Sequence, residues 1–192
     1  MTRMRPLPVK SWPPEMHDAL EAMTPAGHEQ SLTGDNRRQG ANILGALAHH
    51  PALAKAFFTL NGHLLRATSL HPRQRELVIM RMAVLRQCSY EWAQHVFLAR
   101  DAGLTDVEIA WIAWGPDAPF WDGRDASVLR AVGELDRGGV ITDETWAALV
   151  EHLDAQQILD IIFTAGAYAT IAWMVQSLGI ELDDDLRESL TG

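Results

Sequence analysis

The feature that most constrains this chain is the helical spacing of the apolar residues between positions 73 and 102. In residues 73–85 the apolar side chains recur at intervals of three and four, which is typical of an amphipathic helix. Residues 89–100 repeat this spacing, and Ser89 is a suitable N-cap for a second helix. No segment alternates apolar and polar residues with a period of two over a convincing length. The sequence therefore predicts an all-α protein.

The sequence permits two arrangements of these helices, one continuous helix or a hairpin. One unbroken helix would place Glu76 and His95 roughly 28 Å apart, at about 1.5 Å per residue. A bend near Arg86 and Gln87 would instead make the helices antiparallel and bring Glu76 and His95 side by side. Because Ser89 is suited to cap a new helix, we expect the bend, and with it a central antiparallel helix hairpin.

The best candidates for chemistry all lie in this predicted hairpin. They are the one cysteine of the chain, Cys88, two carboxylates in apolar surroundings, Glu76 and Glu91, and His95. On the second helix Cys88, Glu91 and His95 recur at i, i+3 and i+7 and so share one face. Burial is expected to raise the pKa of Glu76 toward neutrality. Glu91, in the first turn of a helix, is expected to stay ionised.

The spacing of these residues resembles that of the carboxymuconolactone decarboxylase and alkylhydroperoxidase D superfamily. The peroxidase branch of that superfamily carries a glutamate, eleven further residues and then Cys-x-x-Cys-x-x-x-His. Here the relay glutamate falls on Glu76, the first cysteine on Cys88 and the histidine on His95, while Glu91 stands at the second cysteine position. The letters YEWAQH resemble a large branch that lacks the dithiol pair. The resemblance covers roughly residues 36–180 and implies an alkylhydroperoxidase D-like helical fold.

The first functional hypothesis is an acid–base enzyme that needs no cofactor. His95 would donate or accept the substrate proton, Glu76 would orient His95, and Glu91 would act as the second base. This set suits decarboxylation, isomerisation or elimination on a small carbonyl or lactone substrate. Trp92 and Tyr168 would shape an apolar pocket for that substrate. The resemblance points to small lactones or peroxides, and the chain does not select among them.

Three alternatives are open. A thiol peroxidase would use Cys88, because a position just before a helix N-terminus lowers a thiol pKa, but its sulfenate would need an external thiol. A non-catalytic oligomeric scaffold would bury Glu76 in an ion network with Arg73, Arg81 or His95. A metal site made by Glu91, His95 and Glu76 lacks a second histidine, so neither a metal nor a cofactor is expected.

Charge and cysteine content narrow the remaining function classes. The 192 residues suit one domain, and the net charge of −9 argues against nucleic acid and an anionic membrane surface as partners. A single cysteine fits a reducing compartment. The first residues lack the apolar run of a secretory signal, so a cytoplasmic location is expected.

Three segments are expected along the chain: an N-terminal arm with a short helix (1–35), a helical domain (36–180) and an acidic tail (181–192). Residues 155–178 contain a single charged residue, Asp160, yet several glutamines make this stretch too polar for a membrane span. A central core or subunit-interface helix is the better interpretation. The resemblance implies a homo-oligomer, a trimer or hexamer, with a dimer as the further option.

Overall fold

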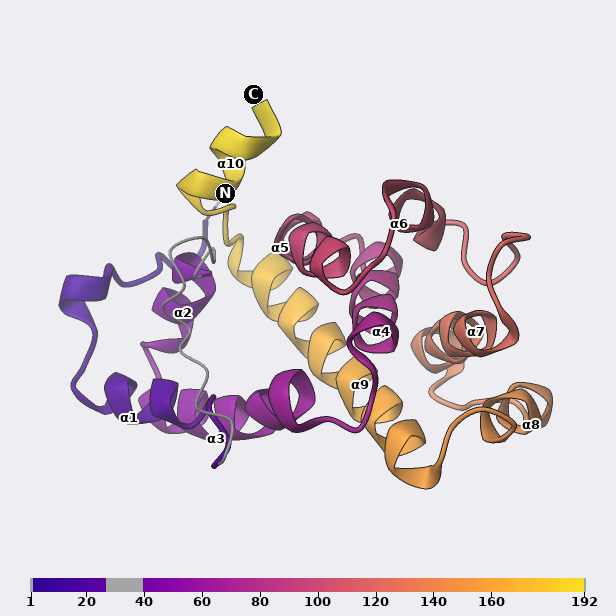
Figure 1. Cartoon of the computed structure of the whole chain (residues 1–192). Coiled ribbons are helices and arrows are strands. Elements are labelled where there is room, and N and C mark those ends of the chain that lie inside the picture. The colour runs from indigo at the N-terminus through magenta and orange to yellow at the C-terminus, as the bar shows by residue number, and fades with distance from the viewer. Residues whose placement is uncertain (1, 27–39, 192) are drawn as a thin grey trace. The chain divides into compact units, whose positions relative to one another are not determined.

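The computed structural model describes residues 2–26 and 40–191, with side chains through residue 187 (Figure 1). All secondary structure in these ranges is helical, so the all-α prediction is confirmed. The predicted boundary between the N-terminal arm (1–35) and the helical domain (36–180) lies outside the described residues. The chain divides into two compact units, Met1–Ala67 with Met174–Gly192 and Thr68–Trp173.

The first unit gathers both ends of the chain. Its elements are a 3-10 turn, η1 (Val9–Ser11), and helices α1 (Glu15–Glu21), α2 (Ala41–Leu47), α3 (Pro51–Gly62) with a π-helical continuation, η2 (His63–Ala67), and α10 (Asp184–Thr191). Its core is formed by buried apolar side chains from α1 to α3, namely Met16, Ala19, Leu47, Ala48, Ala54 and Phe58. Most of the predicted acidic tail (181–192) is helical, as α10.

The arm that precedes α1 is tied down by backbone hydrogen bonds. The amide of Leu7 donates to the carbonyl of Gly45 at 2.9 Å, and the amide of Arg3 donates to the carbonyl of Leu178 at 2.7 Å. A side chain at Gly45 would collide with the carbonyl oxygen of Leu7, so glycine permits this close approach. The arm is therefore held against the first unit.

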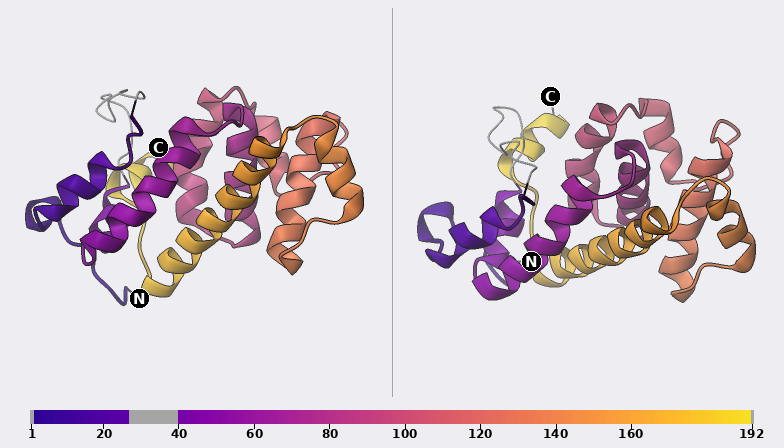
Figure 2. Two further views of the ribbon diagram at one scale, coloured as in Figure 1. Left: turned by 90° about the horizontal axis from the view of Figure 1, so that it is seen from below. Right: turned by 60° about the horizontal axis from the view of Figure 1, so that its bottom comes forward.

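The second unit is built around α4 (Pro72–Leu85), which packs against α5 (Ser89–Asp101), α6 (Asp106–Ile112) and α7 (Gly123–Gly138). Helix α8 (Asp143–Val150) packs on α7, and the long α9 (Ala155–Leu178) follows (Figure 2). Residues 77–80 of α4 are completely buried. Full burial of four successive residues accounts for the wide apolar band in this part of the sequence.

The bend between α4 and α5 is confirmed at the predicted place. Gln87 has a left-handed backbone with φ of 53°, and the amide of Cys88 donates to the carbonyl of Ala83 at 2.8 Å. These features end α4 and reverse the chain. The N-cap of α5 is Cys88 rather than Ser89, and its side chain makes no capping hydrogen bond.

Local caps fix the other helix ends that position the site. Thr105 and Glu108 form a capping box at the start of α6. Asp154 accepts a 2.9 Å hydrogen bond from the amide of Gln157 at the start of α9. One turn further, the buried carboxylate of Asp160 accepts hydrogen bonds from the backbone amide and hydroxyl of Ser69, each at 2.7 Å. This contact ties α9 to the segment that leads into α4.

Helix α9 is, among the described helices, the one that is long and apolar enough to cross a membrane by length and composition. Within the protein, 61% of its most apolar stretch is buried. Burial of this extent agrees with the core or interface helix that the sequence predicts.

Candidate active site

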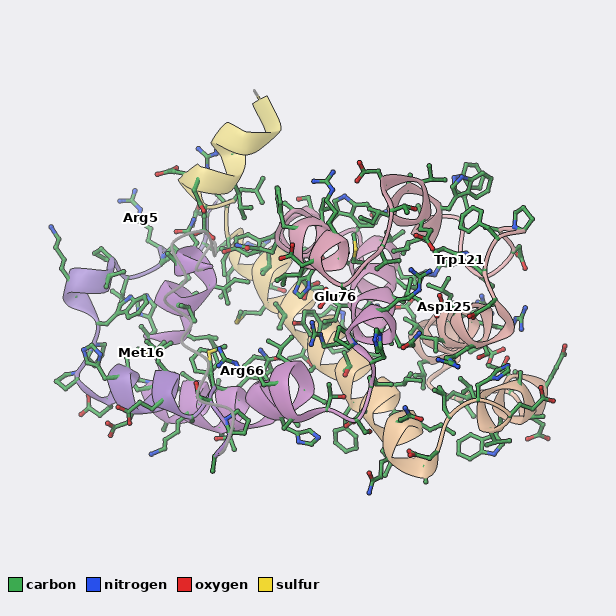
Figure 3. The ribbon with its side chains drawn as sticks, viewed as in Figure 1. Arg5, Met16, Arg66, Glu76, Trp121 and Asp125 are labelled. Atoms are coloured by element: carbon green, nitrogen blue, oxygen red, sulfur yellow. The ribbon has the colours of Figure 1, made fainter. Side chains whose placement is uncertain are left out.

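Glu76 is the centre of a buried ion network in the second unit. Its carboxylate comes from α4, and Figure 3 shows it where α4, α5 and α9 come together. Oε2 lies 2.7 Å from Nδ1 of His95, and Oε1 accepts hydrogen bonds from the guanidinium of Arg75 at 2.9 Å. The exposed fraction of Glu76 is 0%. The hairpin thus brings Glu76 and His95 side by side, as the sequence predicts.

The charge state of Glu76 differs from the expectation. Burial is the largest single influence and raises its pKa, but the charges and hydrogen bonds of His95 and Arg75 together outweigh burial and lower the pKa below 4.5. The prediction of a pKa near neutrality is therefore wrong, because it counted desolvation without the two cations. An ionised carboxylate only accepts hydrogen bonds, so Nδ1 of His95 carries the proton between them.

His95 is nearly buried, with 9% of its side chain exposed against 17% for Arg75. It lies on α5, two turns after Cys88. Tyr168 from α9 presents its ring edge to the imidazole, with centroids 5.1 Å apart and an interplanar angle of 84°. Because Glu76 and Tyr168 fix the imidazole from two helices, Nε2 is left as the ring atom that can exchange a proton.

Glu91 is a buried carboxyl group on the same face of α5. Within the described part of the chain neither of its oxygens has a hydrogen-bond partner. Burial raises its pKa to about 8. The expectation that Glu91 stays ionised is therefore wrong, since desolvation outweighs the favourable helix N-terminus. At neutral pH Glu91 is mainly a neutral acid that can donate a proton.

Cys88 is buried at the N-cap of α5. Burial, followed by the negative charge of nearby Glu91, raises the pKa of its thiol to about 12. The expectation of a lowered thiol pKa is wrong, because a helix N-terminus does not offset desolvation and a neighbouring carboxylate.

The two residues predicted to shape a substrate pocket differ in their surroundings. Tyr168 is buried, and burial followed by the charges of Glu76 and Glu91 raises its pKa well above 10, so its hydroxyl stays protonated. Trp92 is half-buried and follows Glu91 on α5. Its assignment to a pocket stays a prediction.

Arg75 is the residue of this network that the sequence did not reveal. Adjacent residues on a helix point in different directions, so a pair at i and i+1 is not expected to meet. The two arginines that the sequence offered as partners are used elsewhere. Arg73 binds Glu108 and Asp125, and Arg81 donates to the carbonyls of α6.

The described residues contain no group of three or more His, Cys, Asp or Glu side chains arranged to hold a metal ion. The side chains of His95 and Glu91 are suited to proton transfer. A histidine fixed by an ionised carboxylate lies on the same helix as a neutral carboxylic acid with a raised pKa.

The sequence and fold have relatives among known proteins. A model of the carboxymuconolactone decarboxylase family matches residues 51–134. No curated protein matches the sequence at a significant level.

Several solved structures share the fold. An uncharacterized peroxidase-related protein from Ralstonia eutropha, described as an alkylhydroperoxidase AhpD core, has a TM-score of 0.75 at 18% identity and covers 96% of this chain and 94% of its own. A peroxidase-related protein from Silicibacter sp. TM1040 has a TM-score of 0.75 at 16% identity, covering 96% and 93%. The debrominase Bmp8 has a TM-score of 0.74 at 12% identity, covering 97% and 95%.

The motif spacing, the family match and the shared helical fold agree with one another. Over residues 51–134 the chain is similar to the carboxymuconolactone decarboxylase family, and it shares the helical fold of alkylhydroperoxidase D-like proteins.

Proposed function

We propose that this protein is a cofactor-independent acid–base enzyme that acts on a small carbonyl or lactone substrate. The observation that carries the proposal is the 2.7 Å bond from His95 Nδ1 to the buried carboxylate of Glu76, with Glu91 left unpaired on the same helix. A carboxylate that fixes one imidazole nitrogen leaves the other to act on substrate. The match of residues 51–134 to the carboxymuconolactone decarboxylase family supports the same class of reaction.

In the proposed reaction His95 Nε2 takes a proton from the carbon next to a carbonyl group. The C–H electron pair moves into the carbonyl, and the developing oxyanion takes the proton of Glu91 to give an enol. Where the carbonyl is conjugated to a C=C bond, the product is a dienol, and His95 returns the proton to its far carbon while the O–H proton goes back to Glu91, which isomerises the substrate. Where the substrate is a β-keto carboxylate, the bond to the carboxylate breaks instead and its electron pair forms the enol double bond as carbon dioxide leaves; Glu91 protonates the oxygen. The enol then takes a proton on carbon from water and returns its O–H proton to Glu91. Glu76 stays ionised and balances the imidazolium charge.

The pKa values suit these roles. Glu91, with a pKa of about 8, is protonated at neutral pH yet close enough to neutrality to give up its proton. Glu76, with a lowered pKa, stays charged. When the surroundings of two carboxyl groups push their pKa values apart, one can act as a proton donor while the other stays ionised. Here Glu91 would donate the proton and ionised Glu76 would orient the base, His95.

The alternative is a thiol peroxidase that uses Cys88. The names of the two peroxidase-related neighbours favour it. In that reaction the Cys88 thiolate would attack a hydroperoxide, release the alcohol or water and become a sulfenate, which an external thiol would reduce. A thiol with a pKa of about 12 holds almost no thiolate at neutral pH, and this places the peroxidase second.

A non-catalytic scaffold is favoured by one observation, the complete burial of Glu76 between Arg75 and His95. Such networks are common structural features. On this hypothesis the network only supports folding, and replacement of His95 would alter stability without altering any turnover.

The test compares wild type with His95→Asn, Cys88→Ser and a control, His17→Asn, which changes an exposed histidine in the first unit. Carboxylated lactones and β-keto acids are the carbonyl probes, followed by carbon dioxide release and deuterium uptake from D2O. Hydrogen peroxide and an organic hydroperoxide are the oxidant probes, followed by peroxide loss. We expect turnover of a carbonyl probe that is lost only in His95→Asn.

Each other outcome assigns a different function. Peroxide consumption lost in Cys88→Ser, with no carbonyl turnover, would replace the proposal by the peroxidase. Equal, negligible rates for all four proteins with both probe sets would favour the scaffold.

A further inference from the structure

The two oxygens of the Glu76 carboxylate have different partners. Nε of Arg75 donates to Oε1 at 2.9 Å, and Nη2 of the same guanidinium lies 2.9 Å from that oxygen. Oε2 lies 2.7 Å from Nδ1 of His95. Because a carboxylate is planar, a partner that fixes Oε1 also fixes the direction in which Oε2 accepts a hydrogen bond. The position of Arg75 is thus transmitted through Glu76 to the imidazole.

Burial makes the charge of Arg75 count strongly at this place. Glu76 is completely buried, and the side chains of His95 and Arg75 are largely buried. Charges in contact in such surroundings interact much more strongly than charges on a wetted surface. Burial raises the pKa of Glu76, and Arg75 is one of the two groups, with His95, that together lower it. The guanidinium therefore affects the charge of the site as well as its geometry.

The other charged groups near Glu76 do not supply a second permanent cation. Helices α5 and α9 contribute titratable groups to this region, namely His95, Glu91 and Tyr168. Helices α6 and α7 contribute Glu108 and Asp125, and both of these carboxylates bind Arg73. Among the residues that the structure describes, Arg75 is the one always-charged group with a hydrogen bond to Glu76.

We propose that Arg75 is a positioning residue that sets the pH range in which His95 acts as the base. Its guanidinium holds Oε1 so that Oε2 is directed at Nδ1, and its positive charge opposes the uptake of a further proton by the Glu76–His95 pair. Arg75 acts through Glu76 and not on the substrate. This inference rests on the proposed function for its catalytic consequence, whereas its effect on proton binding is a property of the resting protein.

The sign of the effect follows from the charge. A cation in contact with a buried carboxylate disfavours the protonated form of the Glu76–His95 pair, so its removal favours that form. Without the Arg75 charge the pair should take up its proton at a pH that is higher by at least about one unit, a tenfold change in proton affinity. The two groups titrate together, so this midpoint belongs to the pair. His95 would then be a free base only above the higher midpoint.

The test is an NMR titration of the resting protein, without substrate. The signals are the side-chain carboxyl carbon of Glu76 and the imidazole of His95. Arg75→Gln removes the charge but keeps an amide that can donate to Oε1, and Arg75→Lys keeps the charge on a single nitrogen. The control is Arg124→Gln, which changes an exposed arginine of α7 in the same unit.

The three variants should separate clearly. We expect Arg75→Gln to raise the midpoint by at least about one pH unit and Arg75→Lys by less than about half of that shift. The control should titrate as wild type does. An unchanged midpoint in Arg75→Gln, or equal shifts in Arg75→Gln and Arg75→Lys, would overturn the proposal.

A measurement on wild type decides the result even where Arg75→Gln disturbs folding. Because Nε–H of Arg75 donates to Oε1, its NMR signal should shift as the pair takes up a proton, with the same midpoint as the imidazole signal of His95. The disappearance of this signal in Arg75→Lys identifies it. A signal that stays constant while His95 titrates would overturn the proposal.

Turnover distinguishes this inference from the proposed function. With a carbonyl probe that wild type converts, Arg75→Gln should move the acidic limb of the kcat/KM profile to higher pH by the shift seen in the titration, and the rate should recover above it. A rate lowered equally at every pH would mean that Arg75 only supports the fold, and would overturn the proposal. If no carbonyl probe is converted, the proposed function fails, while the titration still decides whether Arg75 controls proton binding.

Discussion

The carboxylate of Glu76 and Nδ1 of His95 lie 2.7 Å apart, although they belong to different helices of the hairpin. The reversal at Gln87 creates this pair, and Arg75 joins it from the same helix as Glu76. The buried, ionised carboxylate lies between the guanidinium of Arg75 and the imidazole of His95 and gives the imidazole a fixed orientation. The pair is therefore both a stabilising element and the centre of the proposed chemistry.

Replacement of Glu76 by glutamine should destabilise the fold. Glu76→Gln keeps the shape of the side chain but removes the charge that pairs with Arg75 and His95. Breaking a buried pair from one side typically costs several kcal/mol, so we expect a loss of about 3 kcal/mol at pH 7 in urea denaturation. Glu151→Gln, at an exposed glutamate, is the control and should change stability by less than about 0.5 kcal/mol.

The same substitution has a pH signature. Because the folded pKa of Glu76 is lowered from 4.5, its stabilisation is present above that pH and is lost as pH falls through the folded pKa. Wild type and Glu76→Gln should therefore converge in stability under acidic conditions. A stability difference that stays constant from pH 7 to pH 3 would contradict the lowered pKa.

Glu91 should give the opposite pH dependence. Its folded pKa of about 8 lies above the ordinary value of 4.5, so the folded state binds more protons between these values and its stability falls as pH rises. Glu91→Gln cannot ionise and should lack this fall. The substitution should therefore raise the free energy of unfolding more at pH 8 than at pH 5. We expect the difference between the two pH values to be on the order of 2–4 kcal/mol.

This prediction is checked by urea denaturation of wild type and Glu91→Gln at pH 5, 6, 7 and 8. Parallel curves for the two proteins would mean that Glu91 titrates normally. In the proposed enzyme Glu91→Gln should also lower turnover about 10²-fold or more, because an amide cannot supply the proton.

The thiol of Cys88 should be slow to react in the folded protein. Because the pKa is raised to about 12, thiolate is scarce at pH 7 to 9 and burial limits access. We expect modification by a disulfide reagent at least about 100 times slower than in the protein unfolded by guanidinium. Rapid modification at pH 7 without denaturant would reverse the order of the two enzymatic hypotheses.

Gln87 stores backbone strain at the bend of the hairpin. Its φ of 53° lies in the left-handed region, which glycine adopts without the clash of a Cβ. Gln87→Gly should therefore stabilise the protein by about 1 kcal/mol in thermal or urea denaturation. Gln87→Ala retains the Cβ and should give no comparable gain, and equal effects of the two substitutions would show that the clash is not the cause.

Much of the fold could be predicted because helices and their ends are determined by residues that are close together in the sequence. The spacing of apolar residues identified the helices of the hairpin. The expected bend near Arg86 and Gln87 marked the end of the first of these helices, and the reversal lies there. Each signal acts within one or two helical turns and needs no knowledge of distant neighbours. The roles of the candidate site residues, by contrast, stay predictions.

The charge states of the site were decided only by the tertiary structure. The sequence shows that Glu76 and Glu91 both lie among apolar residues, and it assigned their pKa shifts in the wrong order. A pKa depends on the balance of desolvation against the charged and hydrogen-bonding groups that packing brings into contact with the carboxyl group. Glu76 meets Arg75 and His95, Glu91 meets no hydrogen-bond partner among the described residues, and packing alone makes that distinction.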